Sequence, residues 1–134
     1  SHAYPRPQND PFHFALTLKN LAAVWKNFKQ VGVKCLILPR VFESRDKLVD
    51  YHKAIPNAEI QVVGLRAKLD TIHNRLKNRD EGKTLEWHLD RATVLTQQFD
   101  QKQVEDFVIN TDTKSIKEVA QEILTRSGLL KNIS

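Results

Sequence analysis

The chain has 134 residues, of which 40% are hydrophobic and 28% are charged, and this length and composition predict one globular domain, residues 1–134. No apolar run reaches the roughly 20 residues that a membrane-spanning helix needs, so we expect no membrane contact. The single cysteine, Cys35, excludes an internal disulfide, so we expect a cytoplasmic protein. The net charge of +5 favours an anionic partner, but the basic residues are interleaved with acidic ones, which argues against nucleic acid.

The chain should begin with an irregular arm and a long helix. Residues 1–10 contain two prolines and no apolar period, so we expect no regular structure there. Asp10 and Pro11 can then start a helix, since aspartate caps helices and proline suits their first position. Gly32 ends this helix. Its inner stripe consists of Leu18, Leu21, Ala22, Trp25 and Phe28.

A short strand and a short helix follow. Val33–Leu38 is almost wholly apolar, which is typical of a parallel strand buried on both faces, and Pro39 ends it. Ser44 can cap a helix at Arg45–Ala54. Because parallel strands carry ligands at their carboxyl ends, the segment that begins at Pro39 lies where an α/β protein binds its ligands.

The central stretch combines a second apolar strand with a helix that carries two arginines. Ile60–Leu65 is apolar on both faces, again the pattern of a buried parallel strand. On the following helix, Arg75 and Arg79 lie one turn apart, so both guanidinium groups can approach the same anion. Arginine suits phosphate because its planar fork makes bidentate bonds and keeps its charge. The inner stripe of this helix consists of Leu69, Ile72 and Leu76.

A glycine hinge and three further elements complete the chain. The hinge contains Gly82 and leads to a helix that Thr84 can cap. Glu105–Thr111 is the third predicted strand. Ser115 and Glu118 then form a capping box for the last helix. This alternation of helices and strands predicts an α/β fold, a layered parallel sheet with helices on both faces.

At these residues the sequence resembles a known class of enzymes. The run Val62–Arg79 is similar to the strand, helix and lid of P-loop small-molecule and nucleotide kinases, such as adenylate, gluconate and shikimate kinases, whose lids carry an Arg-Leu-x-x-Arg run like residues 75–79. The whole chain resembles the C-terminal part of bacterial ATP-binding proteins of the kinase-like P-loop class. The matching segments are DPFHFALTLKNLAAVWKNF, LILPRVFESR, EWHLDRA and EDFVINTDTKSIKEVAQEIL.

One departure from this class concerns the phosphate-binding loop. No Gly-x-x-x-x-Gly-Lys-[Ser/Thr] occurs among the 134 residues, which include only four glycines, so the loop, its lysine and its magnesium-binding hydroxyl are absent. The resemblance therefore implies a fragment that lacks the first strands, one of which would lie between Val33–Leu38 and Ile60–Leu65. An N-terminal segment supplied separately, a homo-oligomer partner or a rearranged sheet would have to fill that gap.

The resemblance also implies roles for particular residues. A lid-like segment at about residues 75–91 would close over ATP, with its arginines on the transferring phosphate. The loop after the third strand would lie beside the adenine, and the loop after the first strand would face the acceptor. The implied residues are Arg75, Arg79 and Arg91 for catalysis, Asp112 and Thr113 for nucleotide binding, and Arg40 and Glu43 for acceptor binding.

Each of these roles has a plain structural alternative. The arginine pair could lie on a solvated helix face, with Asp80 and Glu81 as partners. Arg91 could pack on Trp87 one turn earlier, and Arg40 could form a surface ion pair with its acidic neighbour. A simple helix-entry turn would account for the loop on the nucleotide side. The five histidines show no metal-ligand spacing, so we predict no metal site.

The sequence thus predicts the C-terminal portion of an ATP-binding, kinase-like P-loop protein. Such a protein would transfer a phosphoryl group from ATP to a small-molecule acceptor, with ATP and Mg²⁺ as cofactors of the intact protein. We expect the 134 residues alone to be inactive and to hold no cofactor. The alternative, from a different class, is a non-catalytic α/β module that binds a protein or forms oligomers.

Overall fold

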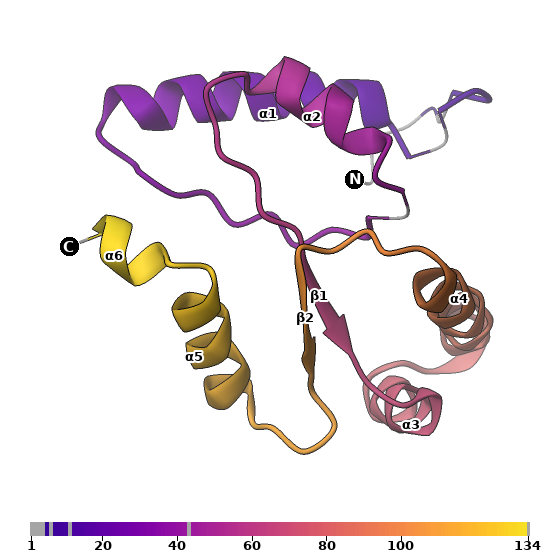
Figure 1. Cartoon of the computed structure of the whole chain (residues 1–134). Coiled ribbons are helices and arrows are strands. Elements are labelled where there is room, and N and C mark those ends of the chain that lie inside the picture. The colour runs from indigo at the N-terminus through magenta and orange to yellow at the C-terminus, as the bar shows by residue number, and fades with distance from the viewer. Residues whose placement is uncertain (1–4, 6, 11, 43, 134) are drawn as a thin grey trace. The chain divides into compact units, whose positions relative to one another are not determined.

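The computed structural model describes residues 5, 7–10, 12–42 and 44–133. These residues form helices together with a two-stranded parallel sheet (Figure 1). The combination is compatible with the predicted α/β class, whereas the layered sheet with helices on both faces stays a prediction. The elements are α1 (Phe14–Gln30), α2 (Lys47–Ala54), β1 (Val63–Arg66), α3 (Leu69–Arg79), α4 (Gly82–Gln101), β2 (Phe107–Asn110), α5 (Ile116–Arg126) and α6 (Leu129–Ile133).

The chain divides into two compact units. Unit 1 comprises Ser1–Arg40 and Asp46–Ile60, and unit 2 comprises Val41–Arg45 and Gln61–Ser134. Unit 1 therefore holds α1 and α2, while unit 2 holds the sheet and the other four helices.

In unit 1, the predicted Asp10 carboxylate does bond to the first turn of α1, but the residue at the N-cap position is His13. The Asp10 carboxylate accepts the N–H groups of Phe14 at 2.6 Å and Ala15 at 2.9 Å. The helix nevertheless begins only at Phe14, because His13 has a left-handed backbone with φ 50°. The predicted role of Pro11 lies outside the described residues. At the other end, Gly32 has φ 85° and stops the helix as expected.

The two helices of unit 1 share a small apolar core. The Phe14 and Tyr51 rings meet edge to face with centroids 5.9 Å apart, a favoured arrangement for aromatic pairs. Leu21 of α1 and Ile55, just after α2, are also buried. The second helix begins at Lys47, two residues later than predicted.

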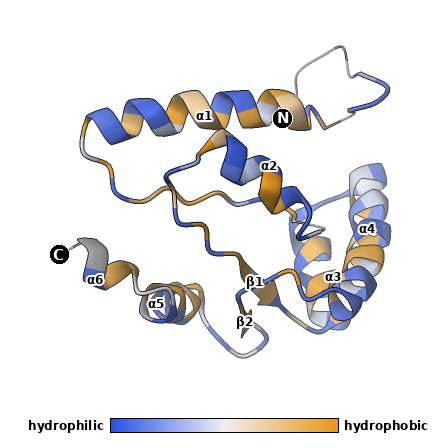
Figure 2. Cartoon of the chain, turned by 45° about the horizontal axis from the view of Figure 1, so that its top comes forward, coloured by the Kyte–Doolittle hydropathy of each residue, from blue (hydrophilic) through white to orange (hydrophobic). Residues whose placement is uncertain are grey.

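The structure contradicts the strand predicted at Val33–Leu38. This segment follows α1 outside any helix or strand, and Figure 2 shows hydrophobic residues along it. Ile37 is 73% exposed and Leu38 is 50% exposed. A strand needs a neighbour that pairs with its backbone N–H and C=O groups, and no segment in the described part of the chain pairs with this one. The apolar composition alone therefore does not make a strand here.

In unit 2, two of the predicted strands form and pair. They run parallel in a register that places Val63 opposite Phe107 and Arg66 opposite Asn110. Asp106 extends the pairing by one step, because its N–H donates to the carbonyl of Val62 at 2.8 Å and its carboxylate accepts the Val62 N–H at 2.7 Å. Both strands are shorter than predicted.

The sheet is buried unevenly. Ile109 of β2 is fully buried and Val104, just before β2, is 2% exposed. Leu65 of β1, in contrast, is 56% exposed, so the prediction that this strand is buried on both faces is wrong. The physical reason is that β1 has a described neighbour on one side only, and burial of both faces of a parallel sheet requires covering layers.

A half-buried ion pair joins β1 to the segment before β2. The Arg66 guanidinium donates to the Glu105 carboxylate at 2.6 Å and lies 4.6 Å from the Phe99 ring centroid. Gly64 makes room for this pair, since a Cβ atom there would lie 2.6 Å from Cγ of Glu105. This is a position where the absence of a side chain is required by close approach.

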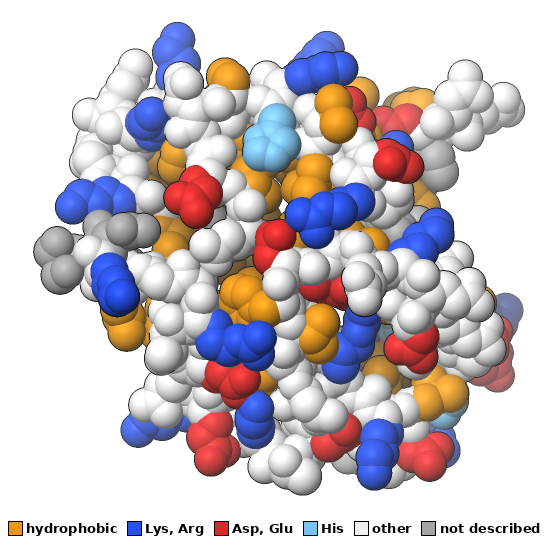
Figure 3. Space-filling view, in the orientation of Figure 1, with side chains coloured by type: hydrophobic (Ala, Val, Ile, Leu, Met, Phe, Trp, Pro, Cys, Tyr) orange, Lys and Arg blue, Asp and Glu red, His pale blue; other side chains and the backbone are white. Residues whose placement is uncertain are grey.

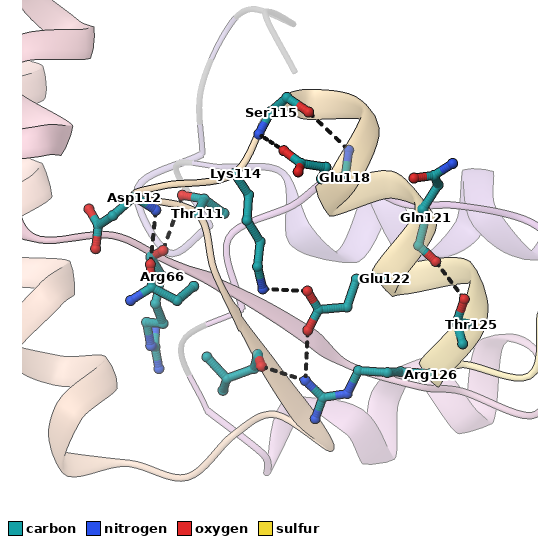
Figure 4. Close-up of polar contacts among 12 residues, drawn as sticks. Arg66, Thr111, Asp112, Lys114, Ser115, Glu118, Gln121, Glu122, Thr125 and Arg126 are labelled. Carbon is teal, nitrogen blue, oxygen red and sulfur yellow. Dashed lines mark hydrogen bonds and ion pairs between the residues drawn. The ribbon is translucent and has the colours of Figure 1, made fainter.

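Two helix ends bear on the predictions. The α4 helix begins at Gly82 with φ 61°, so the cap predicted at Thr84 is wrong and the glycine itself starts the helix. The capping box of α5 is confirmed, with Ser115 and Glu118 bonding reciprocally (Figure 4). Within the described residues, no helix is both long and apolar enough to cross a bilayer.

Candidate functional site

The carboxyl ends of β1 and β2 form one edge of the sheet because the strands are parallel. Ligands of open α/β sheets bind at this edge. Thr111, the first residue after β2, ties the two strand ends together: its N–H donates to the Arg66 carbonyl at 2.7 Å, and its hydroxyl donates to the same oxygen at 3.1 Å (Figure 4). We call residues 66–68 and 110–113 the strand-end site.

Arg75 reaches the strand-end site from the middle of α3. Its Nη1 donates to the hydroxyl of Thr111 at 2.9 Å and its Nη2 donates to the carbonyl of Thr111 at 2.8 Å. Both acceptors are neutral, and the side chain is exposed. A charged fork with two donors is therefore already aimed at the sheet edge, where an anion can compete with the two neutral oxygens.

Asp112 holds the start of α3 against the loop after β2. Its Oδ1 accepts the N–H of Lys68 at 2.9 Å, and its own N–H donates to Oδ1 of Asn110 at 2.8 Å. The Lys68 N–H, followed by the hydroxyl of Thr71, lowers the pKa of Asp112 below its usual value. The carboxylate is thus ionised at neutral pH and anchors the loop. Thr113 is exposed beside it.

Arg79 has a different partner from Arg75. Its Nε and Nη2 donate to the two carboxylate oxygens of Asp80 at 3.0 and 2.8 Å, and Nδ1 of His88 lies 2.7 Å from the same carboxylate. The Arg79 hydrogen bonds lower the pKa of Asp80, and the carboxylate in turn raises the pKa of the guanidinium. Arg79 therefore pairs with Asp80, one of the two acidic partners that the alternative of a solvated helix face predicted. Arg75 and Arg79 bond to different residues in this structure.

The remaining predicted site residues are Arg91, Arg40 and Glu43. Arg91 is half-buried in α4. Arg40 belongs to unit 1, where its guanidinium lies 5.6 Å from the centroid of the Phe14 ring. Glu43, and with it the predicted pair with Arg40, lies outside the described residues. Within unit 2, the structure thus brings Arg75 to Thr111 in the loop after β2, the loop that also carries Asp112 and Thr113.

Sequence reasoning missed Lys68 and Thr111. Thr111 directly follows β2 and Lys68 comes two residues after β1. Both therefore lie at the edge where ligands bind, and that position is the signal that could have found them. Lys68 supplies the N–H that Asp112 accepts, and its positive charge also lowers the pKa of Asp112. Thr111 is the acceptor of both Arg75 bonds.

The chain matches no protein family, no curated protein and no solved structure in the comparisons made. The resemblance to P-loop kinases therefore stays a hypothesis carried by the sequence motifs. In the described part of the chain, no group of three or more His, Cys, Asp or Glu side chains could hold a metal ion. On the face shown in Figure 3, Lys and Arg side chains are interspersed with Asp and Glu.

Proposed function

We propose that the chain is the C-terminal portion of a kinase-like, ATP-binding P-loop protein that transfers a phosphoryl group from ATP to a small-molecule acceptor. In this proposal the strand-end site receives the phosphates. The residues present fit that group, because Arg75 offers two donors at the edge where α/β proteins bind ligands. A bound ATP would supply the phosphoryl group, and Mg²⁺ would neutralise the phosphate oxygens.

The observation that carries the proposal is a contrast among the arginines of unit 2. Four of them pair with a carboxylate, at distances of 2.6–3.4 Å, whereas the hydrogen bonds of Arg75 go to the neutral oxygens of Thr111. A phosphate that replaces Thr111 gains a charge-assisted bond and displaces no counter-ion. The four carboxylate-paired arginines are Arg45, Arg66, Arg79 and Arg126.

The remaining roles follow from the same proposal. Arg79 would have to leave Asp80 before it could join Arg75 on the phosphate, so we infer that the α3–α4 turn at Gly82 moves when the site fills. Arg91 would follow on α4. The phosphate-cradling loop that the 134 residues do not contain would come from another segment or another chain. Asp112 and Thr113 would lie beside the nucleotide, and Arg40 and Glu43 would face the acceptor.

Calorimetric titration of the 134-residue chain with tripolyphosphate and with MgATP tests the site. Two charge-assisted hydrogen bonds of roughly 1.5–3 kcal/mol each predict weak binding, with a Kd of about 1 mM. Arg75→Gln should weaken binding about tenfold or more, since it removes one such bond or both.

Lys77→Gln is the matched control, because it removes the same charge from an exposed position on the same helix. Equal binding by the two variants, or no binding by the unchanged chain, would contradict the proposed site. The chain alone should not turn over ATP, and measurable hydrolysis would show that the account of the absent loop is wrong.

A second candidate function rests on the Val33–Leu38 segment. An apolar run with the composition of a buried strand but with Ile37 73% exposed offers a surface for pairing with another polypeptide. The alternative function is thus a non-catalytic module that binds a protein or forms oligomers. Sedimentation at a series of concentrations tests self-association. Oligomers that dissociate in the Ile37→Lys variant would support self-association through this segment. A monomer at every concentration would exclude the oligomer.

A further inference from the structure

A groove runs between the two helices of unit 1 and is lined by none of the residues of the strand-end site. It consists of two adjoining hollows of about 320 and 430 Å³, which share Ala22 of α1 and Ala54 of α2. The two alanines lie in its floor together with Trp25, which is half-buried. Small side chains at the centre of such a floor allow the backbone of another helix to approach closely. We call this feature the α1–α2 groove.

Lysines line the groove on both walls. Lys19, Lys26 and Lys29 come from α1 and Lys53 comes from α2. The three lysines of α1 share one face with Ala22, because their spacings of three, four and three residues follow the helical repeat. All four lysines are exposed, and one acidic side chain, Asp50, opposes them among the lining residues.

The dimensions of this lysine row match a short helix. Ten residues separate Lys19 from Lys29, which at 1.5 Å per residue is about 15 Å, or nearly three turns of a partner helix. The Nζ atom of Lys29 lies 5.9 Å from the centroid of the Trp25 ring, so charge and apolar surface adjoin in the groove. A partner that fits must present an apolar stripe to the floor and negative charge to both rims.

We propose that the α1–α2 groove binds an acidic amphipathic helix of a protein partner. The lysines favour a partner with negative charge, and the mainly aliphatic floor favours the apolar face of a helix. A single-stranded nucleic acid fits less well, because its bases stack on a series of aromatic side chains and Trp25 is the one aromatic ring among the lining residues. This proposal is independent of the strand-end site.

Tryptophan fluorescence tests the proposal directly. In a Trp87→Phe background, Trp25 is the only tryptophan and reports on the floor of the groove. The probe is a lactam-stapled helix of about 14 residues, or roughly 21 Å, with leucines on one face and glutamates on the others. Its addition should shift the Trp25 emission to the blue and saturate. Lys26→Glu with Lys29→Glu should weaken binding at least about tenfold.

Three controls make the result decisive. Lys117→Glu reverses a charge on α5 in unit 2 and should leave the affinity unchanged within about twofold. A peptide of the same composition in scrambled order should not bind. An unchanged emission, equal binding of the scrambled peptide, or equal binding by the double lysine variant would overturn the proposal. Tighter binding of an oligouridylate than of the acidic helix would also overturn it, and would make the groove a nucleic-acid site.

Discussion

Two similar apolar segments, one in each unit, differ in whether they form a strand. Phe107–Asn110 in unit 2 becomes a strand because β1 supplies partners for its backbone and Asp106 extends the pairing. Val33–Leu38 in unit 1 is at least as apolar, yet it belongs to no sheet and exposes Ile37 and Leu38. Strand formation therefore depends on a neighbour as much as on composition, since unpaired backbone groups gain nothing from an extended conformation.

The largest expected effect distinguishes two isoleucines, Ile109 of unit 2 and Ile37 of unit 1. Ile109→Ala should lower the free energy of unfolding of unit 2 by about 2–5 kcal/mol, because the side chain is fully buried and leaves a cavity. Ile37→Ala should change stability by less than about 0.5 kcal/mol, because its side chain is 73% exposed. Urea denaturation is followed by Trp87 in a Trp25→Phe background for unit 2 and by Trp25 in a Trp87→Phe background for unit 1. Similar losses for the two variants would show that the Val33–Leu38 segment is packed in solution.

A second prediction concerns the ion pair between Arg66 and Glu105 in unit 2. Gly64→Ala should cost about 1–3 kcal/mol, because the new Cβ would lie 2.6 Å from Cγ of Glu105 and force the carboxylate away from Arg66. Gly128→Ala is the control: its φ of 71° is strained for alanine but the surrounding space is open, so it should cost only about 1 kcal/mol. Urea midpoints measure both, and an unaffected Gly64→Ala variant would mean that Glu105 moves without penalty.

A third, smaller effect depends on pH. The N–H of Val62, followed by Arg45, lowers the pKa of Asp106 below its ordinary value of 3.8. Because the folded-state pKa is the lower one, the stabilisation is complete above pH 3.8 and is lost as the pH falls through the folded-state value. Asp106→Asn should therefore flatten the fall in unfolding free energy between about pH 4 and pH 2. Parallel curves for the two proteins would refute this role.

Much of the local structure could be predicted from the sequence. The Asp10 bonds to the first turn of α1, the α5 capping box and the pairing-competent strands near residues 63 and 107 follow from side-chain chemistry and apolar pattern. Strand ends and pairing could not be predicted, because they depend on which neighbours the chain brings together. The same holds for the site: arginine spacing indicated a phosphate partner, but the distinction between Arg75 and Arg79 depends on the positions of Thr111 and Asp80.

That distinction is the centre of the functional account, and nuclear magnetic resonance of the ¹⁵N-labelled chain tests it most directly. Titration with tripolyphosphate should shift the side-chain signal of Arg75 and the backbone amides of Lys68 and Thr111 together, with saturation, and should move the signal of Arg79 less. The account would be contradicted if Arg75 stayed unchanged while the signals of the surface lysines shifted throughout the chain.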